Sequence, residues 1–170
     1  MRTKVQRRTS AGYKGQEDQS RKGRLILMPH SQVFCLVHLV FSTSGRQPTI
    51  REQMRDRLHA YLGGIARENA MVAIAVGGVA DHVHLLHSLP STVPIAKAVP
   101  LLKSGSSKWI HENFPQSRGF SWQQGYGAFS VSVSQQAKTV AYIHAQAKHH
   151  ERVSSTEEFR KFLMAHAILP

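Results

Sequence analysis

The feature that most constrains the fold is an unbroken apolar run over residues 33–41, VFCLVHLVF. It is rich in β-branched and aromatic residues and far too short to span a membrane as a helix. Such a run is typical of a central strand that is buried on both faces. The single cysteine, Cys35, lies within it, so we expect a small core residue that cannot form an internal disulfide. A reducing, cytoplasmic location fits this cysteine usage.

Helical and strand patterns alternate along the rest of the chain. Apolar residues at helical spacing predict a helix over residues 50–69, with Thr49 and Glu52 at capping-box spacing before it. The remaining patterns predict strands over residues 71–76, 79–89 and 128–133, and helices over residues 94–113, 138–151 and 156–167. We expect Pro100 to kink or break its helix, and Ser155 and Glu158 to form a capping box at the start of the last one.

This order of elements predicts an α+β fold of the ferredoxin-like, split β-α-β kind. We expect a four-stranded antiparallel sheet with helices on one face, followed by C-terminal helices. Many unrelated functions use this fold, so the function has to be argued from the site.

The charge of the chain favours a polyanionic partner. There are 22 lysine and arginine residues against 10 acidic residues, which gives a net charge of +12 and suggests nucleic acid. Residues 1–27 form a basic segment without periodicity, and residues 28–170 form the expected single catalytic domain. The basic segment is interpreted as a disordered tail, as the product of a misassigned start before Met28, or as a DNA-binding arm.

His82 and His84 are the first candidate site residues. Residues two apart on a strand point to the same face, so these imidazoles lie roughly 6–7 Å apart and can share a divalent cation. Val83 between them faces the core. A pair of structural histidines is the alternative, because the chain has 11 histidines.

Tyr142 and Gln146 are the second candidates, four residues apart on a predicted helix. Tyr142 could be a packed residue with its hydroxyl at the surface, or a nucleophile that attacks a phosphodiester. Because a tyrosine hydroxyl has a pKa of about 10, such attack needs a metal that polarises the phosphate. Gln146 could complete the metal site with a neutral oxygen, and mixed nitrogen and oxygen ligands suit Mn²⁺ better than Mg²⁺.

These motifs together resemble the single-tyrosine HUH transposases of the insertion-sequence 200/605 type (the transposase 17 family, which includes relatives acting on repetitive extragenic palindromes). The resemblance covers residues 28–170. It is carried by the His-Val-His strand, the stretch FSWQQGYGAFSVS at residues 120–132, Tyr142 with Gln146 and the following His149-His150, residues 33–44, and KSGSSKWI at residues 103–110.

The resemblance implies a site and a reaction. His82, His84 and Gln146 would be ligands of Mg²⁺ or Mn²⁺, and Tyr142 would be the nucleophile. Family members bind hairpins in single-stranded DNA and cut it, leaving a 5′-phosphotyrosine and a 3′-hydroxyl, and they rejoin strands by the reverse attack. The resemblance also implies a homodimer, in which one subunit's tyrosine helix can complete the other's site, and a cytoplasmic, nucleoid-associated protein without membrane or nucleotide cofactor.

Several other residues are open to two interpretations. Tyr126 is a rival nucleophile, His38 a core histidine, and His149 and His150 could transfer protons, contact DNA or end a helix favourably. Candidate DNA contacts, each of which could instead be an ordinary surface or packed residue, are Arg46, Lys103, Lys108, Arg118, Trp122 and Tyr126.

Three competing functions remain open. A nucleotide hydrolase with a histidine triad would need a third histidine where Leu86 stands. A non-catalytic DNA- or RNA-binding module on the same fold would leave one set of residues unexplained: His82, His84, Tyr142 and Gln146. A domesticated transposase relative that serves the host genome would have identical chemistry.

Overall fold

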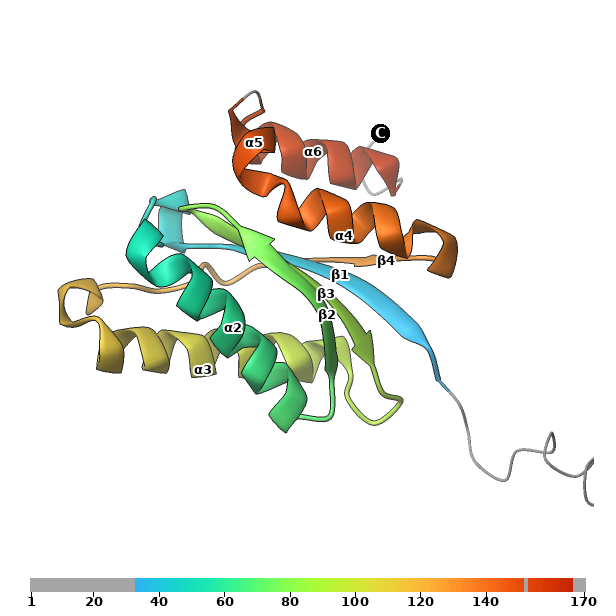
Figure 1. Ribbon diagram of the computed structural model, residues 1–170, viewed down its shortest axis with the longest axis horizontal. Coiled ribbons are helices and arrows are strands. Elements are labelled where there is room, and N and C mark those ends of the chain that lie inside the picture. The colour runs from blue at the N-terminus through green and yellow to red at the C-terminus, as the bar shows by residue number, and fades with distance from the viewer. Residues whose placement is uncertain (1–32, 152, 167–170) are drawn as a thin grey trace, which may run out of the picture. The chain divides into compact units, whose positions relative to one another are not determined.

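Four antiparallel strands form one sheet in the order β2-β3-β1-β4 (Figure 1). The strands are β1 (Cys35–Ser42), β2 (Val72–Gly78), β3 (His82–Leu89) and β4 (Gly127–Ser130). The structure is a computed structural model and describes residues 33–151 and 153–166; the predicted tail over residues 1–27 lies outside the described residues. The sheet confirms the predicted topology, with β1 hydrogen-bonded to β3 on one side and β4 on the other.

Two long helices cover one face of this sheet: α2 (Glu52–Glu68) and α3 (Ile95–Asn113). Alternate strand residues point toward them, as the two-residue period of a strand requires. The main core therefore joins residues of β1 and β3 to both helices, among them Leu39, Phe41, Leu58, Leu85 and Leu102.

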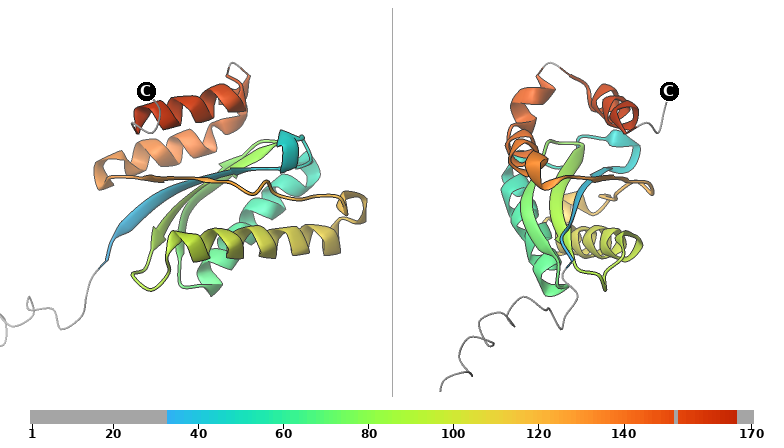
Figure 2. Two further views of the ribbon diagram at one scale, coloured as in Figure 1. Left: turned by 180° about the vertical axis from the view of Figure 1, so that it is seen from behind. Right: turned by 90° about the vertical axis from the view of Figure 1, so that its right-hand side faces the viewer.

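The C-terminal helices cover the opposite face, as the side-on views in Figure 2 show. They are α4 (Gln136–His144), α5 (Gln146–His150) and α6 (Ser155–Ala165); the short 3-10 turns are η2 (Ser44–Arg46), η3 (Pro115–Ser117) and η4 (Val133–Gln135). A smaller apolar cluster anchors α4 to the sheet through Leu36, Ala75, Leu86 and Ile143. None of the described helices combines the length and apolar character needed to cross a membrane.

Gly77 permits the close approach of α4 to β2. A Cβ at this position would collide with the backbone carbonyl of Ile143 and lie 2.9 Å from its Cγ2. Since Tyr142 is the neighbour of Ile143, this contact sets how near the tyrosine helix lies to the sheet.

The prediction that Cys35 is a core residue is wrong, because its side chain is exposed. Cys35 opens β1 and pairs with Leu89, the last residue of β3, so it lies at the end of the sheet. The apolar run of the sequence extends beyond the part of the strand that the helices cover.

The expected break at Pro100 does not occur, because α3 is continuous from Ile95 to Asn113. A proline removes one hydrogen bond, here to the carbonyl of Ala96 in the preceding turn. Both Pro100 and Ala96 are exposed, so water can satisfy that carbonyl.

Both predicted capping boxes are wrong. Helix α2 begins at Glu52 with Arg51 at its N-cap, and Thr49 instead donates its hydroxyl to the carbonyl of Gln47. In α6 the cap lies one residue earlier than predicted, since the Ser154 hydroxyl accepts from the Glu157 backbone at 3.2 Å. Ser155 and Glu158 are therefore free for other contacts.

Candidate active site

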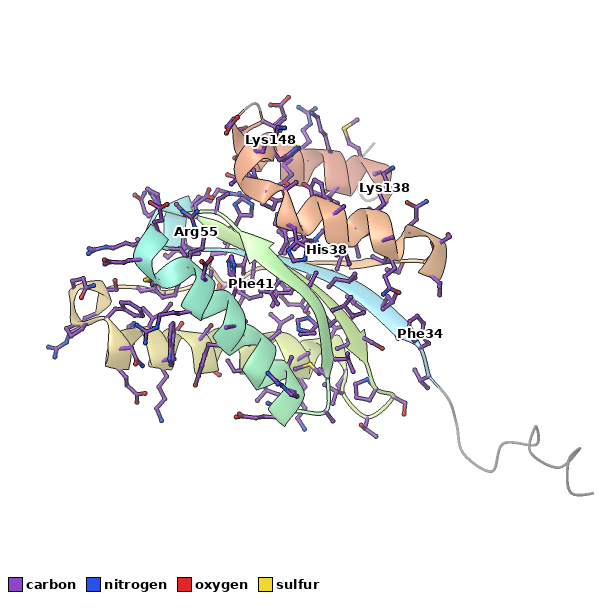
Figure 3. All side chains as sticks on the ribbon, viewed as in Figure 1. Phe34, His38, Phe41, Arg55, Lys138 and Lys148 are labelled. Atoms are coloured by element: carbon purple, nitrogen blue, oxygen red, sulfur yellow. The ribbon has the colours of Figure 1, made fainter. Side chains whose placement is uncertain are left out.

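The site lies where the start of β3 meets the three C-terminal helices. His82 and His84 project from the sheet face that α4 covers, with ring centroids 4.9 Å apart, and both side chains are buried. Val83 points to the opposite face and into the main core, as predicted. Figure 3 shows His38 of β1 near the same helix.

His82 is oriented by the carboxylate that precedes it. Its Nδ1 lies 2.7 Å from Oδ1 of Asp81, whose Oδ2 accepts the Ser155 hydroxyl at 2.8 Å. Partial burial favours the neutral acid, but the hydrogen bonds from His82 and Ser155 outweigh it and lower the pKa of Asp81. The carboxylate thus holds the Nδ1 hydrogen of His82 and leaves Nε2 with a lone pair directed into the site.

His84 is held by a second histidine. Its Nδ1 lies 2.9 Å from Nε2 of His38. Burial, followed by the charge of His84, lowers the pKa of His38 to about 3. Burial, followed by the charge of His82, lowers the pKa of His84 well below its ordinary value. Both rings are therefore neutral at physiological pH, and the buried Nε2 of His84 has no hydrogen-bond partner among the described residues.

His150, from α5, adds a third imidazole to the same place. Its Nδ1 donates to the Val153 carbonyl at 2.7 Å, and its ring lies 4.7 Å from that of His82. Burial, followed by the charge of His82, lowers the pKa of His150. The buried Nε2 has no hydrogen-bond partner within the described part of the chain and faces the site.

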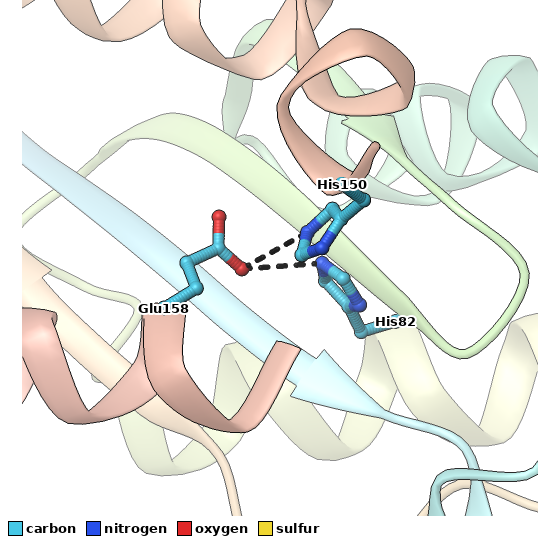
Figure 4. A group of neighbouring side chains, drawn as sticks. All are labelled: His82, His150 and Glu158. Atoms are coloured by element: carbon cyan, nitrogen blue, oxygen red, sulfur yellow. Dashed lines mark ion pairs between the residues drawn. The ribbon is translucent and has the colours of Figure 1, made fainter. Parts of the chain in front are cut away.

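Glu158 of α6 stands at the centre of this group. Its Oε2 lies 3.4 Å from Nε2 of both His82 and His84 and 3.2 Å from Nε2 of His150 (Figure 4 marks the contacts with His150 and with His82). Burial raises the pKa of this carboxyl to about 7, although the imidazole of His82 opposes the rise. A carboxylate at this position faces three converging ring nitrogens.

The other oxygen of Glu158 faces the candidate nucleophile. Oε1 accepts the hydroxyl hydrogen of Tyr142 and, at 3.1 Å, the side-chain amide of Gln146. The Tyr142 ring lies 5.8 Å from that of His84 in the same chain. One carboxylate therefore links the tyrosine to the histidine cluster.

These donors fit a divalent cation. One ligand atom each from His82, His150 and Glu158 lies within 4.8 Å of the others, and the Nε2 of His84 points to the same carboxylate oxygen. Each imidazole has its Nδ1 engaged by a fixed neighbour, which is the usual arrangement behind metal-binding histidines. A set of imidazoles and one carboxylate suits a transition metal such as Mn²⁺ better than Mg²⁺.

The predicted residue Gln146 reaches the site from a different helix than Tyr142. The backbone leaves the helical conformation at Ala145, so α4 ends before Gln146 and α5 begins with it. Oε1 of Gln146 nevertheless lies 3.4 Å from Nε2 of His82. The structure thus brings together His82, His84, Tyr142 and Gln146.

Sequence reasoning missed Asp81, Ser155 and Glu158 as members of this site. The position of Asp81 directly before the His-Val-His motif was an available signal. Ser155 and Glu158 carried none, because their spacing matched a helix cap.

Two of the candidate DNA contacts have structural roles. Lys103 donates to the carbonyls of Gln123, Gln124 and Gly125 at 2.7–3.1 Å, which occupies its three hydrogens. The Trp122 indole donates to the Ser106 hydroxyl at 2.9 Å and packs against Phe41.

The other candidate DNA contacts lie outside the central cluster. Lys108 and Glu112 form an exposed pair at 3.9 Å, and Arg118 and Tyr126 are exposed. The guanidinium of Arg46 lies 5.9 Å from the Phe159 ring, at the edge of the site.

The comparison with known families assigns this fold and site to a class of DNA transposases. Residues 31–146 match the family described as "Transposase IS200 like", and the chain belongs to this family. It is thus a transposase of the IS200/IS605 type, a DNA-cleaving class of enzyme that acts in DNA transposition and recombination. The matched segment ends at Gln146, so His150 and Glu158 lie beyond it.

Individual relatives agree with this assignment. The chain is 29% identical over 114 residues to the ISDra2 transposase TnpA of Deinococcus radiodurans, a match covering 64% of this chain and 81% of that protein. A crystal structure of a candidate transposase from Deinococcus radiodurans R1 superposes with a TM-score of 0.58 at 26% identity, covering 69% of this chain and 95% of the other. A REP-associated tyrosine transposase bound to a REP hairpin shares the fold, with a TM-score of 0.54, 13% identity, and coverage of 75% and 76%.

Proposed function

We propose that the chain cuts and rejoins single-stranded DNA through a covalent 5′-phosphate bond to Tyr142. The observation that carries this proposal is the convergence of the Tyr142 hydroxyl and three histidine Nε2 atoms on the two oxygens of Glu158. A nucleophile and a cation site that share one carboxylate are close enough to act on one phosphate group.

The proposed cofactor is a divalent metal, Mg²⁺ or Mn²⁺. His82 and His84 would hold it with Oε1 of Gln146, and His150 and Glu158 offer further donors at the same place. A metal bound there supplies Lewis-acid stabilisation of the charge that develops on the scissile phosphate. Asp81 and His38 would orient the rings of His82 and His84.

The residues of the chain account for the proton and bond changes. Oε1 of Glu158 is placed to accept the hydroxyl hydrogen of Tyr142 as the tyrosine oxygen attacks phosphorus. The bond from phosphorus to the 3′-oxygen breaks, and that oxygen takes up a proton and leaves as a 3′-hydroxyl. Rejoining is the reverse reaction, in which a 3′-hydroxyl attacks the phosphotyrosine and the proton returns to Tyr142.

The proposed substrate is single-stranded DNA with hairpin ends. The net charge of +12 favours a polyanion, and a structural relative is bound to a REP hairpin. Residues 28–170 are proposed as the single catalytic domain, which the compact unit Val33–Pro170 supports. In the homodimer that the family resemblance implies, this geometry would give each subunit a complete site.

The test is a denaturing gel of the protein after incubation with Mn²⁺ or Mg²⁺ and single-stranded DNA taken from the genome beside its own coding sequence. We expect a protein–DNA band that resists denaturant and is lost with chelator or with Tyr142→Phe, while Tyr126→Phe retains it. Hairpin binding should survive Tyr142→Phe almost unchanged. A band that persists in Tyr142→Phe would shift the nucleophile to Tyr126. Absence of the band in the unaltered chain, with hairpin binding intact, would favour a non-catalytic DNA-binding module.

A further inference from the structure

A cavity of about 470 Å³ lies between α4 and α6, and the proposed chemistry leaves most of it unused. His38, Tyr142 and Glu158 line its inner end, next to the site. Its size falls within the range of ordinary small-molecule pockets. The α6 side of the cavity lies beyond residues 31–146, so the family match says nothing about it.

One wall of the cavity is an aromatic ring that is held in place by contacts with other rings. Phe162 lines it and is only half-buried, and its ring stacks on that of Phe129 with centroids 5.2 Å apart and an angle of 20°. The edges of Tyr142 and His38 meet Phe162 at 5.8 Å and 5.2 Å. An aromatic ring fixed in this way is a suitable platform for a nucleobase, because every base offers a flat face for stacking.

The cavity also carries positive charge. Lys138 of α4 and Lys161 of α6 both line it, and both are exposed. Lys161 pairs with Glu157 at 3.8 Å, but an exposed pair of this kind is weak and leaves the ammonium available to a stronger anion. Glu158 is the acidic residue of the lining, and it lies at the inner end with Tyr142.

We propose that this cavity holds one nucleotide of single-stranded DNA that adjoins the phosphodiester attacked by Tyr142. The base lies against Phe162, and a phosphate lies toward Lys138 and Lys161. The inference rests on the proposed function, since the reaction at Tyr142 is what brings a DNA strand to this place. It makes α6 part of the substrate-binding surface in addition to its role as the carrier of Glu158.

The test uses the four 2′-deoxynucleoside 5′-monophosphates, titrated into isotopically labelled full-length protein with chelator present. We expect saturable amide shifts in α4 and α6. Ala165 lines the cavity and is exposed, so Ala165→Trp should fill it and weaken binding at least about 10-fold. The control is Met164→Trp, at a neighbouring residue of α6 that is 51% exposed and outside the cavity lining, and it should change binding less than about 2-fold.

A pair of charge variants gives a second, independent reading. Lys138→Glu should weaken nucleotide binding, and Lys148→Glu, an equal charge change on α5 outside the lining, should not (both lysines are labelled in Figure 3). The proposal would be overturned if the two variants of either pair had equal effects on nucleotide binding. It would also be overturned if no saturable amide shifts appeared, or if inorganic phosphate alone caused the same shifts. The titration needs neither metal nor cleavage, so failure of the covalent-adduct assay is a separate result.

Discussion

Ser155 donates its hydroxyl hydrogen to Oδ2 of Asp81 at 2.8 Å, and this bond connects α6 to the residue that orients His82. The two oxygens of Asp81 thus serve a helix start and a candidate metal ligand at once. The position of α6 and the orientation of His82 are therefore coupled.

The first prediction follows from this coupling. Asp81→Asn should weaken Mn²⁺ binding about 10- to 100-fold, because an amide cannot hold the Nδ1 hydrogen of His82 as a carboxylate does. Ser155→Ala should weaken it less, and Thr156→Ala, at the next and exposed residue, should leave it unchanged. Calorimetric titration with Mn²⁺ measures all three. Unaltered affinity in Asp81→Asn would mean that His82 needs no such support.

The second prediction concerns Gly77, whose missing side chain lets α4 lie against β2. Gly77→Ala should destabilise the fold by about 1–3 kcal/mol through overpacking and should displace Tyr142, so adduct formation should fall as well. Gly64→Ala is the control: no atom lies within 4 Å of a Cβ there, and it should stabilise α2 by about 0.5–1 kcal/mol. Urea denaturation and the adduct gel provide the measurements. The same stability change in both variants would contradict close packing at Gly77.

The third prediction concerns His87 of β3, whose buried side chain lies on the sheet face opposite the candidate site. Neither of its ring nitrogens has a hydrogen-bond partner within the described part of the chain, and burial lowers its pKa from 6.5 to about 4. The imidazole of His87 binds a proton more readily in the unfolded chain than in the folded one. The free energy of unfolding is therefore unaffected by this group above pH 6.5 and decreases as the pH falls from 6.5 toward 4. His87→Leu should stabilise the fold by about 1 kcal/mol at pH 7.

The stability gain of His87→Leu should also grow as the pH is lowered from 6.5 to 4. Urea denaturation of both proteins across that range checks this, and comparing the difference between them cancels the effects of the other histidines. A constant difference across the range would show that His87 is not buried in its neutral form.

The fourth prediction concerns the source of the tyrosine. Tyr142 lies beside His84 of its own chain, with ring centroids 5.8 Å apart. A mixture of Tyr142→Phe and His82→Ala chains should therefore cut DNA no better than either variant alone. A mixture of unaltered and His82→Ala chains serves as the positive control. Restored cutting in the first mixture would show that the tyrosine helix passes between subunits.

The parts of the fold and site that depend on local patterns were predictable. Strand alternation placed His82 and His84 on one face and Val83 on the other, because a strand's side-chain period is fixed by its backbone. The helical spacing that put Tyr142 near Gln146 also led to the right place, although the helix breaks at Ala145.

The contribution of α6 was not predictable in the same way. Glu158 meets His82 only through the packing of α6 over the sheet, and nothing in its local sequence marks that contact. Its capping-box spacing with Ser155 even favoured a different role, and a shift of the cap by one residue to Ser154 changed the roles of both residues. Cys35 and Pro100 show the same limit, since their exposure depends on where the helices end or face.

Because α6 follows β3 and α4 along the chain, Glu158 is the last of these candidate site residues to be synthesised. A ribosome releases the sheet with His82 and His84 first, then Tyr142, and only afterwards the residues of α6. A nascent chain therefore holds its histidines and tyrosine before it holds the carboxylate that joins them. Under the proposed mechanism, polypeptides interrupted before residue 155 would carry the proposed nucleophile without its proton acceptor, and they should therefore not form the covalent adduct with DNA.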